Sequence, residues 1–89
     1  MALYVQKFGG TSVGTADRIE AVAKKIVAFR AHGHDLVVVV SAMSGETNRL
    51  LALSSAITDN PSSRELDVLL STGEQVTIAL LCMALEKLG

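Results

Sequence analysis

The sequence predicts an α/β fold with a mostly parallel sheet and flanking helices. A strand, an amphipathic helix and a second strand follow one another within the first 40 residues. The second strand, residues 36–40, reads LVVVV without polar alternation, which is typical of a parallel strand covered on both faces. Parallel strands need a crossover connection, and the intervening helix supplies it. These observations predict a βαβ unit.

The first strand and helix are predicted from residue type and spacing. Residues 3–8, LYVQKF, are rich in β-formers, and a glycine-rich loop follows at 9–14. Thr15 offers an N-cap for a helix over about 16–31, and Gly33 is placed to end it. The apolar side chains of this helix recur at helical spacing: Ile19, Val22, Ala23, Ile26 and Val27.

A polar loop and a second helix follow the valine strand. The loop SAMSGETN covers residues 41–48, and a helix is expected over about 47–58. The apolar positions of this helix are Leu50, Leu51, Leu53 and Ile57.

The last third of the chain predicts two further helices. Asp59–Pro61 breaks the chain, and Ser62 with Glu65 has capping-box spacing. The stretch STGE at 71–74 interrupts the pattern, and a last helix is expected to run to about residue 88. Since that helix is apolar on nearly every side, it should be buried, with Cys82 as a small core residue.

Composition narrows the function classes. The formal net charge is −1, Lys and Arg do not cluster, and only three residues are aromatic, so no nucleic-acid partner is expected. One cysteine gives no disulfide framework or metal cluster. The apolar run 78–85 is too short to cross a bilayer, and no signal-peptide block is seen. We expect a cytoplasmic protein with no membrane partner.

The chain is apolar for its size, at 49% hydrophobic over 89 residues. A domain this small buries only about 60% of its unfolded surface. We therefore expect a piece of a longer protein, covered by more chain or by another subunit, and self-associating or homo-oligomeric.

The loop KFGGTSVG, residues 7–14, has the features of an anion site. Glycines let backbone N–H groups approach an anion closely, the following helix N-terminus adds partial positive charge, and Lys7 can add a full one. The common phosphate loop and the dinucleotide fingerprint both require other spacings. A glycine-rich turn with a solvated lysine remains the alternative.

Two further loops carry polar groups. Ser41, Ser44, Gly45 and Thr47 follow the second strand, where Thr47 could equally be a routine N-cap. Glu74 opens an apolar stretch; it could hold an ammonium group or merely favour the helix dipole. Since ligands bind beyond the carboxyl ends of parallel strands, the first two loops should share a cleft. The two histidines are expected in an exposed loop with no role: His32 and His34.

Together, KFGGTSV, SAMSGETN and STGEQV resemble the aspartokinases, in order and across the whole chain. The resemblance implies the amino-acid kinase (carbamate kinase-like) fold. It implies that residues 1–89 are the N-terminal portion of the catalytic domain, without its remainder or regulatory domains. The implied reaction is transfer of the ATP γ-phosphoryl group to the β-carboxylate of L-aspartate, the first step toward lysine, methionine and threonine.

The resemblance also implies residue roles. Lys7 would be catalytic, stabilising the transferring group and binding the ATP phosphates. The remaining nucleotide contacts would come from Phe8, Gly9, Gly10, Ser12 and Ser41. The aspartate contacts would come from Gly45, Glu46, Thr47 and Glu74, with Glu74 on the ammonium group. Mg²⁺ would accompany the nucleotide, with no metal ligand from these residues.

Two alternatives stay open. The chain could be a non-catalytic anion-binding or interaction module, or the same fold could serve a different acceptor. The 89 residues alone are expected to be inactive.

Overall fold

The computed structural model describes residues 2–89. Its elements in order are β1 (Leu3–Phe8), α1 (Ala16–Arg30), β2 (Asp35–Val40), α2 (Glu46–Ile57) and α3 (Ser63–Leu88). The strands pair in parallel, in a register running from Leu3 opposite Asp35 to Phe8 opposite Val40. The predicted strand–helix–strand unit is confirmed, with element ends within about a residue of those expected.

The core lies between one face of the sheet, α1 and the C-terminal half of α3. The predicted apolar face of α1 supplies four buried side chains: Ile19, Val22, Ala23 and Ile26. Val13 from the glycine-rich loop, Val40 from β2 and Leu81 from α3 join them. Because Val13 is fully buried, the glycine-rich loop is anchored in the core at its far end.

The other face of the sheet is uncovered, contrary to the expectation for the valine strand. Val37 and Val39 of β2 are 47% and 45% exposed, and Leu3 and Val5 of β1 are 67% and 68% exposed. Side chains alternate between the two faces of a strand, and within residues 2–89 both α1 and α3 pack against the same face. The continuous apolar run therefore predicts a second covering layer that these residues do not supply.

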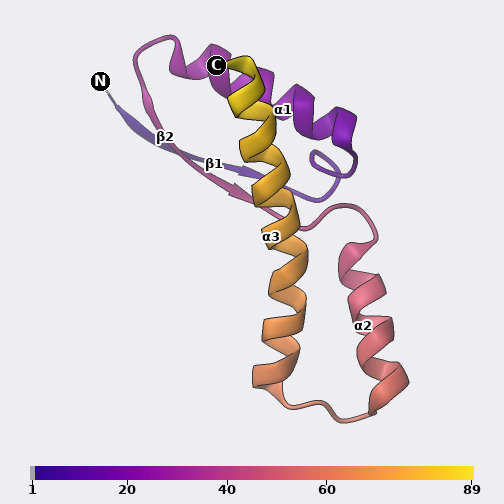
Figure 1. Ribbon diagram of the computed structural model, residues 1–89. Coiled ribbons are helices and arrows are strands. Elements are labelled where there is room, and N and C mark those ends of the chain that lie inside the picture. The colour runs from indigo at the N-terminus through magenta and orange to yellow at the C-terminus, as the bar shows by residue number, and fades with distance from the viewer. Residues whose placement is uncertain (1) are drawn as a thin grey trace.

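α2 and the N-terminal half of α3 form a hairpin that extends away from the sheet (Figure 1). The molecule is consequently elongated, with extents of 49 × 25 × 19 Å. The loop between β2 and α2 lies where this hairpin meets the α/β layer. That junction brings the middle of α3 close to the carboxyl end of β2.

The expected break at 71–74 is wrong, because α3 is one helix of 26 residues. The Ser71 and Thr72 hydroxyls donate to the carbonyls of Val68 and Leu69, at 2.7 and 2.6 Å. These residues therefore satisfy their polar groups within the helix rather than capping a new one. Gly73 lies within this helix and lets it pack closely against neighbouring segments, as described below.

The expectation that the last helix is buried is also wrong for the described residues. Val76, Ile78 and Met83 are 44%, 51% and 61% exposed, and Cys82 is exposed rather than in the core. By length and composition α3 could cross a membrane. This is weak evidence for a membrane, because an apolar core helix meets the same criteria.

The helix N-termini are capped largely as predicted. The Thr15 hydroxyl accepts from the Arg18 amide, and that of Ser62 accepts from the Glu65 amide. α2 differs: its N-cap is Gly45 at φ 80° with no side-chain cap. Thr47 is thus inside the first turn and is not an N-cap.

One histidine is not the exposed loop residue expected. His34 is half-buried, and its ring packs against Tyr4 and Phe29 with centroids 4.9 and 5.0 Å away. This cluster joins the start of both strands to the end of α1. It lies at the opposite end of the strands from the polar loops.

Candidate functional site

The carboxyl ends of the two strands open into a cleft of ≈ 310 Å³. Residues from three separate segments line it: Gly10, Ser41, Ala42, Met43, Ser44, Gly45, Thr47, Asn48 and Glu74. The prediction that the first two polar loops share a cleft is therefore confirmed. The third segment, around Glu74, also belongs to it.

Strand pairing places the first two loops side by side. The parallel ladder continues one step past the strands, where the Ser41 amide donates to the Phe8 carbonyl at 3.2 Å. The loops stay in contact further out, since the Ser44 hydroxyl donates to the Gly10 carbonyl at 3.4 Å. A Cβ at Gly10 would lie 3.5 Å from the Ala42 carbonyl oxygen.

Gly73 brings the third segment to the cleft. It is buried in α3, and a Cβ built on it would lie 3.1 Å from the Ala42 Cβ and 3.4 Å from the Leu50 Cδ1. The missing side chain lets α3 pass close to the loop after β2 and to α2. The next residue, Glu74, then lines the cleft while remaining exposed to solvent.

Half of the predicted site residues come together in this cleft. The predicted residues that line it are Gly10, Ser41, Gly45, Thr47 and Glu74. The φ of 80° at Gly45 favours glycine and turns the chain sharply between the strand and α2. This turn places the Thr47 side chain on the cleft.

The remaining predicted residues do not line the cleft. Phe8 packs against the core, and Phe8 and Ser12 line a separate cavity beside Arg18 and Lys25. The Ser12 amide is turned inward, donating to the Gly9 carbonyl at 3.0 Å. Ser12 is therefore turned away from the cleft.

Lys7 lies at the carboxyl end of β1, opposite Val39. Its place in the strand alternation puts it on the uncovered face of the sheet, with Leu3 and Val5. Its side chain is exposed and does not line the cleft. The next residue, Phe8, is where the two loops meet, because its carbonyl accepts from the Ser41 amide.

Glu46 forms an ion pair instead of facing the cleft. Arg49 binds both of its carboxylate oxygens, at 2.9 and 3.0 Å. The hydrogen bond from Arg49 lowers the pKa of Glu46. The carboxylate, at the first residue of α2, is therefore already bound by Arg49.

Sequence reasoning assigned no role to Asn48, which lines the cleft beside Thr47. The signal was available: an amide in the first turn of a helix that follows a polar glycine loop. Met43 and Ala42 line it too, because strand pairing continues into the loop.

This arrangement favours binding a charged, zwitterionic or phosphorylated small molecule. Glycine backbone and the hydroxyls of Ser41 and Thr47 suit anionic oxygens, and Glu74 suits a cation. Among residues 2–89, no group of three or more His, Cys, Asp or Glu side chains is placed to hold a metal ion.

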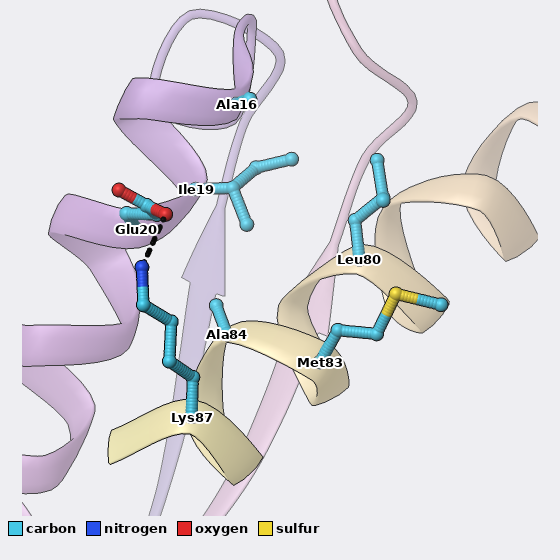
Figure 2. A pocket seen from close by; sticks show the side chains of 7 residues that line it. All are labelled: Ala16, Ile19, Glu20, Leu80, Met83, Ala84 and Lys87. Atoms are coloured by element: carbon cyan, nitrogen blue, oxygen red, sulfur yellow. Dashed lines mark hydrogen bonds and ion pairs between the residues drawn. The ribbon is translucent and has the colours of Figure 1, made fainter.

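A second cavity, of ≈ 210 Å³, lies between α1 and α3 (Figure 2). Its lining is mostly apolar, including Ile19, Leu80 and Met83, and the Lys87 ammonium meets the Glu20 carboxylate at 3.3 Å beside it. None of the three polar loops contributes to it. The cleft at the strand ends is therefore the candidate site.

Comparison with known proteins gives a consistent result. The sequence profile described as the amino acid kinase family matches residues 2–89. The chain is 70% identical over its 89 residues to an aspartokinase of Pseudomonas aeruginosa, and 56% identical to aspartokinase 2 of Bacillus subtilis. In both cases it covers 22% of the relative's length.

A solved structure agrees. The crystal structure of aspartate kinase from Synechocystis matches with a TM-score of 0.93 and 57% identity, over 97% of this chain and 15% of that one. The sequence similarity and the structural similarity thus point to the same group of proteins.

Proposed function

Because the chain belongs to the amino acid kinase family and has its fold, we propose that it carries phosphate- and substrate-binding loops of an aspartate kinase. The protein would transfer the γ-phosphoryl group of ATP to the β-carboxylate of L-aspartate, giving 4-phospho-L-aspartate. The observation that carries this proposal is the meeting of Gly10, Thr47 and Glu74 in one cleft.

The roles follow from charge. The glycine-rich loop and Ser41 would receive the nucleotide phosphates, with the backbone amides of Gly9 and Gly10 directed at them. Lys7 would move from its exposed position toward the transferring group. Phosphoryl transfer needs mainly positioning and charge stabilisation, and this loop supplies both. Mg²⁺ would arrive with ATP and neutralise part of the phosphate charge.

The acceptor, L-aspartate, would lie on the side of the cleft opposite the glycine-rich loop. Thr47 and Gly45 would contact aspartate, and the Glu74 carboxylate would hold its ammonium group. The β-carboxylate is ionised near neutral pH, so attack on the phosphoryl group requires no general base. Glu46 has a smaller part in this proposal, because Arg49 already binds its carboxylate.

In this proposal residues 1–89 form the N-terminal part of the catalytic domain. The chain spans 22% of the length of the relatives it matches. The remaining contacts to adenine and to the aspartate α-carboxylate would come from outside these residues. A cytoplasmic location and a place at the start of lysine, methionine and threonine synthesis would follow.

The test uses the complete gene product with MgATP, L-aspartate and hydroxylamine. Hydroxylamine traps an acyl phosphate as aspartyl hydroxamate, which forms a coloured iron complex. Colour that depends on both ATP and aspartate supports the proposal. Colour with another acceptor but not with aspartate would keep the fold and replace the substrate, and MgATP binding without any transfer would favour a non-catalytic module.

A further inference from the structure

The Ser44 hydroxyl contacts the glycine-rich loop, although Ser44 belongs to the loop after β2. It donates to the Gly10 carbonyl at 3.4 Å, across 34 positions of sequence. A Cβ built on Gly14 would collide with this same Ser44 Oγ, and would lie 3.0 Å from the Gly10 carbonyl oxygen. The hydroxyl thus occupies a space that exists because residue 14 has no side chain.

The far side of the glycine-rich loop is already fixed by other contacts. The amides of Ser12 and Val13 both donate to the Gly9 carbonyl, at 3.0 and 3.2 Å, and Val13 is fully buried. The near side, at Gly10, is half-buried and lines the cleft. Within residues 2–89, the side-chain donor to the Gly10 carbonyl is the Ser44 hydroxyl.

The orientation of that carbonyl affects anion binding. Glycine permits wide rotation about its backbone bonds, so the Gly10–Thr11 peptide can turn. The N–H and C=O of a planar trans peptide point in opposite directions. A rotated peptide would direct a partially negative oxygen at an anion in the cleft, whereas a donor on that oxygen holds it in place and reduces its repulsion.

We propose that Ser44 is a positioning residue for the glycine-rich loop. Its hydroxyl, accommodated by Gly14, holds the Gly10 carbonyl and with it the Gly10–Thr11 peptide, so that the carbonyl oxygen is not free to turn toward phosphate. The ligand in this proposal, the phosphate chain of MgATP, rests on the proposed function. The Ser44–Gly14 contact itself does not.

The first test measures the contact without any activity. Gly14→Ala and Ser44→Ala are made singly and together in the complete gene product, and thermal unfolding is followed. Gly14→Ala should lower the melting temperature less when Ser44 is already alanine, because the Oγ that its methyl group meets is gone. Contacting residues give non-additive changes. Additive changes in the double variant would overturn the contact.

The second test measures nucleotide binding by calorimetry with MgATP. Ser44→Ala should weaken MgATP binding about fivefold, as expected for the loss of one neutral hydrogen bond. KM for MgATP should rise in proportion, while KM for L-aspartate should change little. Ser44→Thr keeps the hydroxyl and should restore binding. Ser55→Ala, on an exposed part of α2, is the matched control and should change nothing.

The outcomes separate this proposal from the proposed function. Unchanged MgATP affinity in Ser44→Ala, or an equal loss in Ser55→Ala, would overturn the role of Ser44. Weakened MgATP binding in a protein that phosphorylates some other acceptor would support Ser44 and contradict the aspartate kinase assignment.

Discussion

Glu74 illustrates how much a single residue's position depends on its neighbour. The sequence singled it out as a carboxylate in an apolar stretch, and the structure places it on the cleft. What the sequence did not predict is the cause, which is the close passage of Gly73 against Ala42. Glu46 shows the converse, since its acidic side chain is bound by Arg49 rather than directed at the cleft.

Glu74→Gln should selectively weaken the binding of L-aspartate to the complete gene product. Losing a hydrogen bond to a charged group costs roughly 1.5–3 kcal/mol, or about 10- to 150-fold in kcat/KM for aspartate. MgATP affinity should stay the same. Glu86→Gln, exposed near the end of the same helix, is the matched control. An equal loss for aspartate and MgATP, or none for either, would show that Glu74 does not bind the ammonium group.

At the scale of elements, α3 is the main departure from expectation. Hydroxyl residues next to glycine usually interrupt a helix, and Thr72 with Gln75 has capping-box spacing. Tertiary packing overrides this local pattern. Gly73, within a continuous helix, packs against the loop after β2 and against Leu50. A local pattern cannot report such a contact between distant segments.

Gly73→Ala tests that contact. Alanine favours a helix by up to about 1 kcal/mol over glycine, but overpacking costs typically 1–3 kcal/mol. The new methyl group would lie 3.1 Å from the Ala42 Cβ, which moves only with the backbone. We therefore expect net destabilisation by about 1 kcal/mol and a higher KM for aspartate. Denaturant unfolding and kinetics measure both.

The matched control for Gly73→Ala is Gln75→Ala, at an exposed position of the same helix. It removes one exposed hydrogen bond to the Ser71 hydroxyl, at 3.4 Å, and should leave KM unchanged and unfolding nearly unchanged. A Gly73→Ala protein that is more stable than the parent and has an unchanged KM would show that the close approach of α3 does not position Glu74.

At the scale of the whole molecule, the uncovered apolar surfaces are the dominant feature. One sheet face and much of α3 are exposed within residues 2–89, with Leu3 and Val5 of β1 at 67% and 68% and Met83 of α3 at 61%. Contiguous apolar patches of this kind mark surfaces that other protein covers. The valine run predicts a strand covered on both faces, and residues 2–89 cover only one of them.

The isolated 89-residue chain should therefore self-associate. Light scattering over a concentration series should give a mass that rises above that of one chain, because association buries the sheet face. Val37→Lys and Val39→Lys together should reduce association, whereas Lys24→Gln and Lys25→Gln on the solvent side of α1 should not. A concentration-independent monomer would contradict this.

The order of the first four elements, the parallel strands and the shared cleft could all be predicted from the sequence. These features follow from local residue patterns and from the geometry of parallel sheets. The position of Ser12 could not, because side-chain direction in a loop depends on turns such as the hydrogen bonds to the Gly9 carbonyl. Asn48 and Ser44 were also not assigned roles, since their roles depend on contacts between loops.

The most direct test of the central claim is hydroxamate formation by the complete gene product and its Lys7→Ala variant. The account predicts ATP- and aspartate-dependent hydroxamate from the parent and a loss of about 100-fold or more in Lys7→Ala, since an electrostatic contact of this kind contributes about 2.7–4 kcal/mol to transition-state stabilisation. Lys24→Ala, at an exposed position of α1, should retain the parent rate. Equal hydroxamate formation by Lys7→Ala and the parent would contradict the claim that this lysine and its glycine-rich loop hold the transferring phosphoryl group.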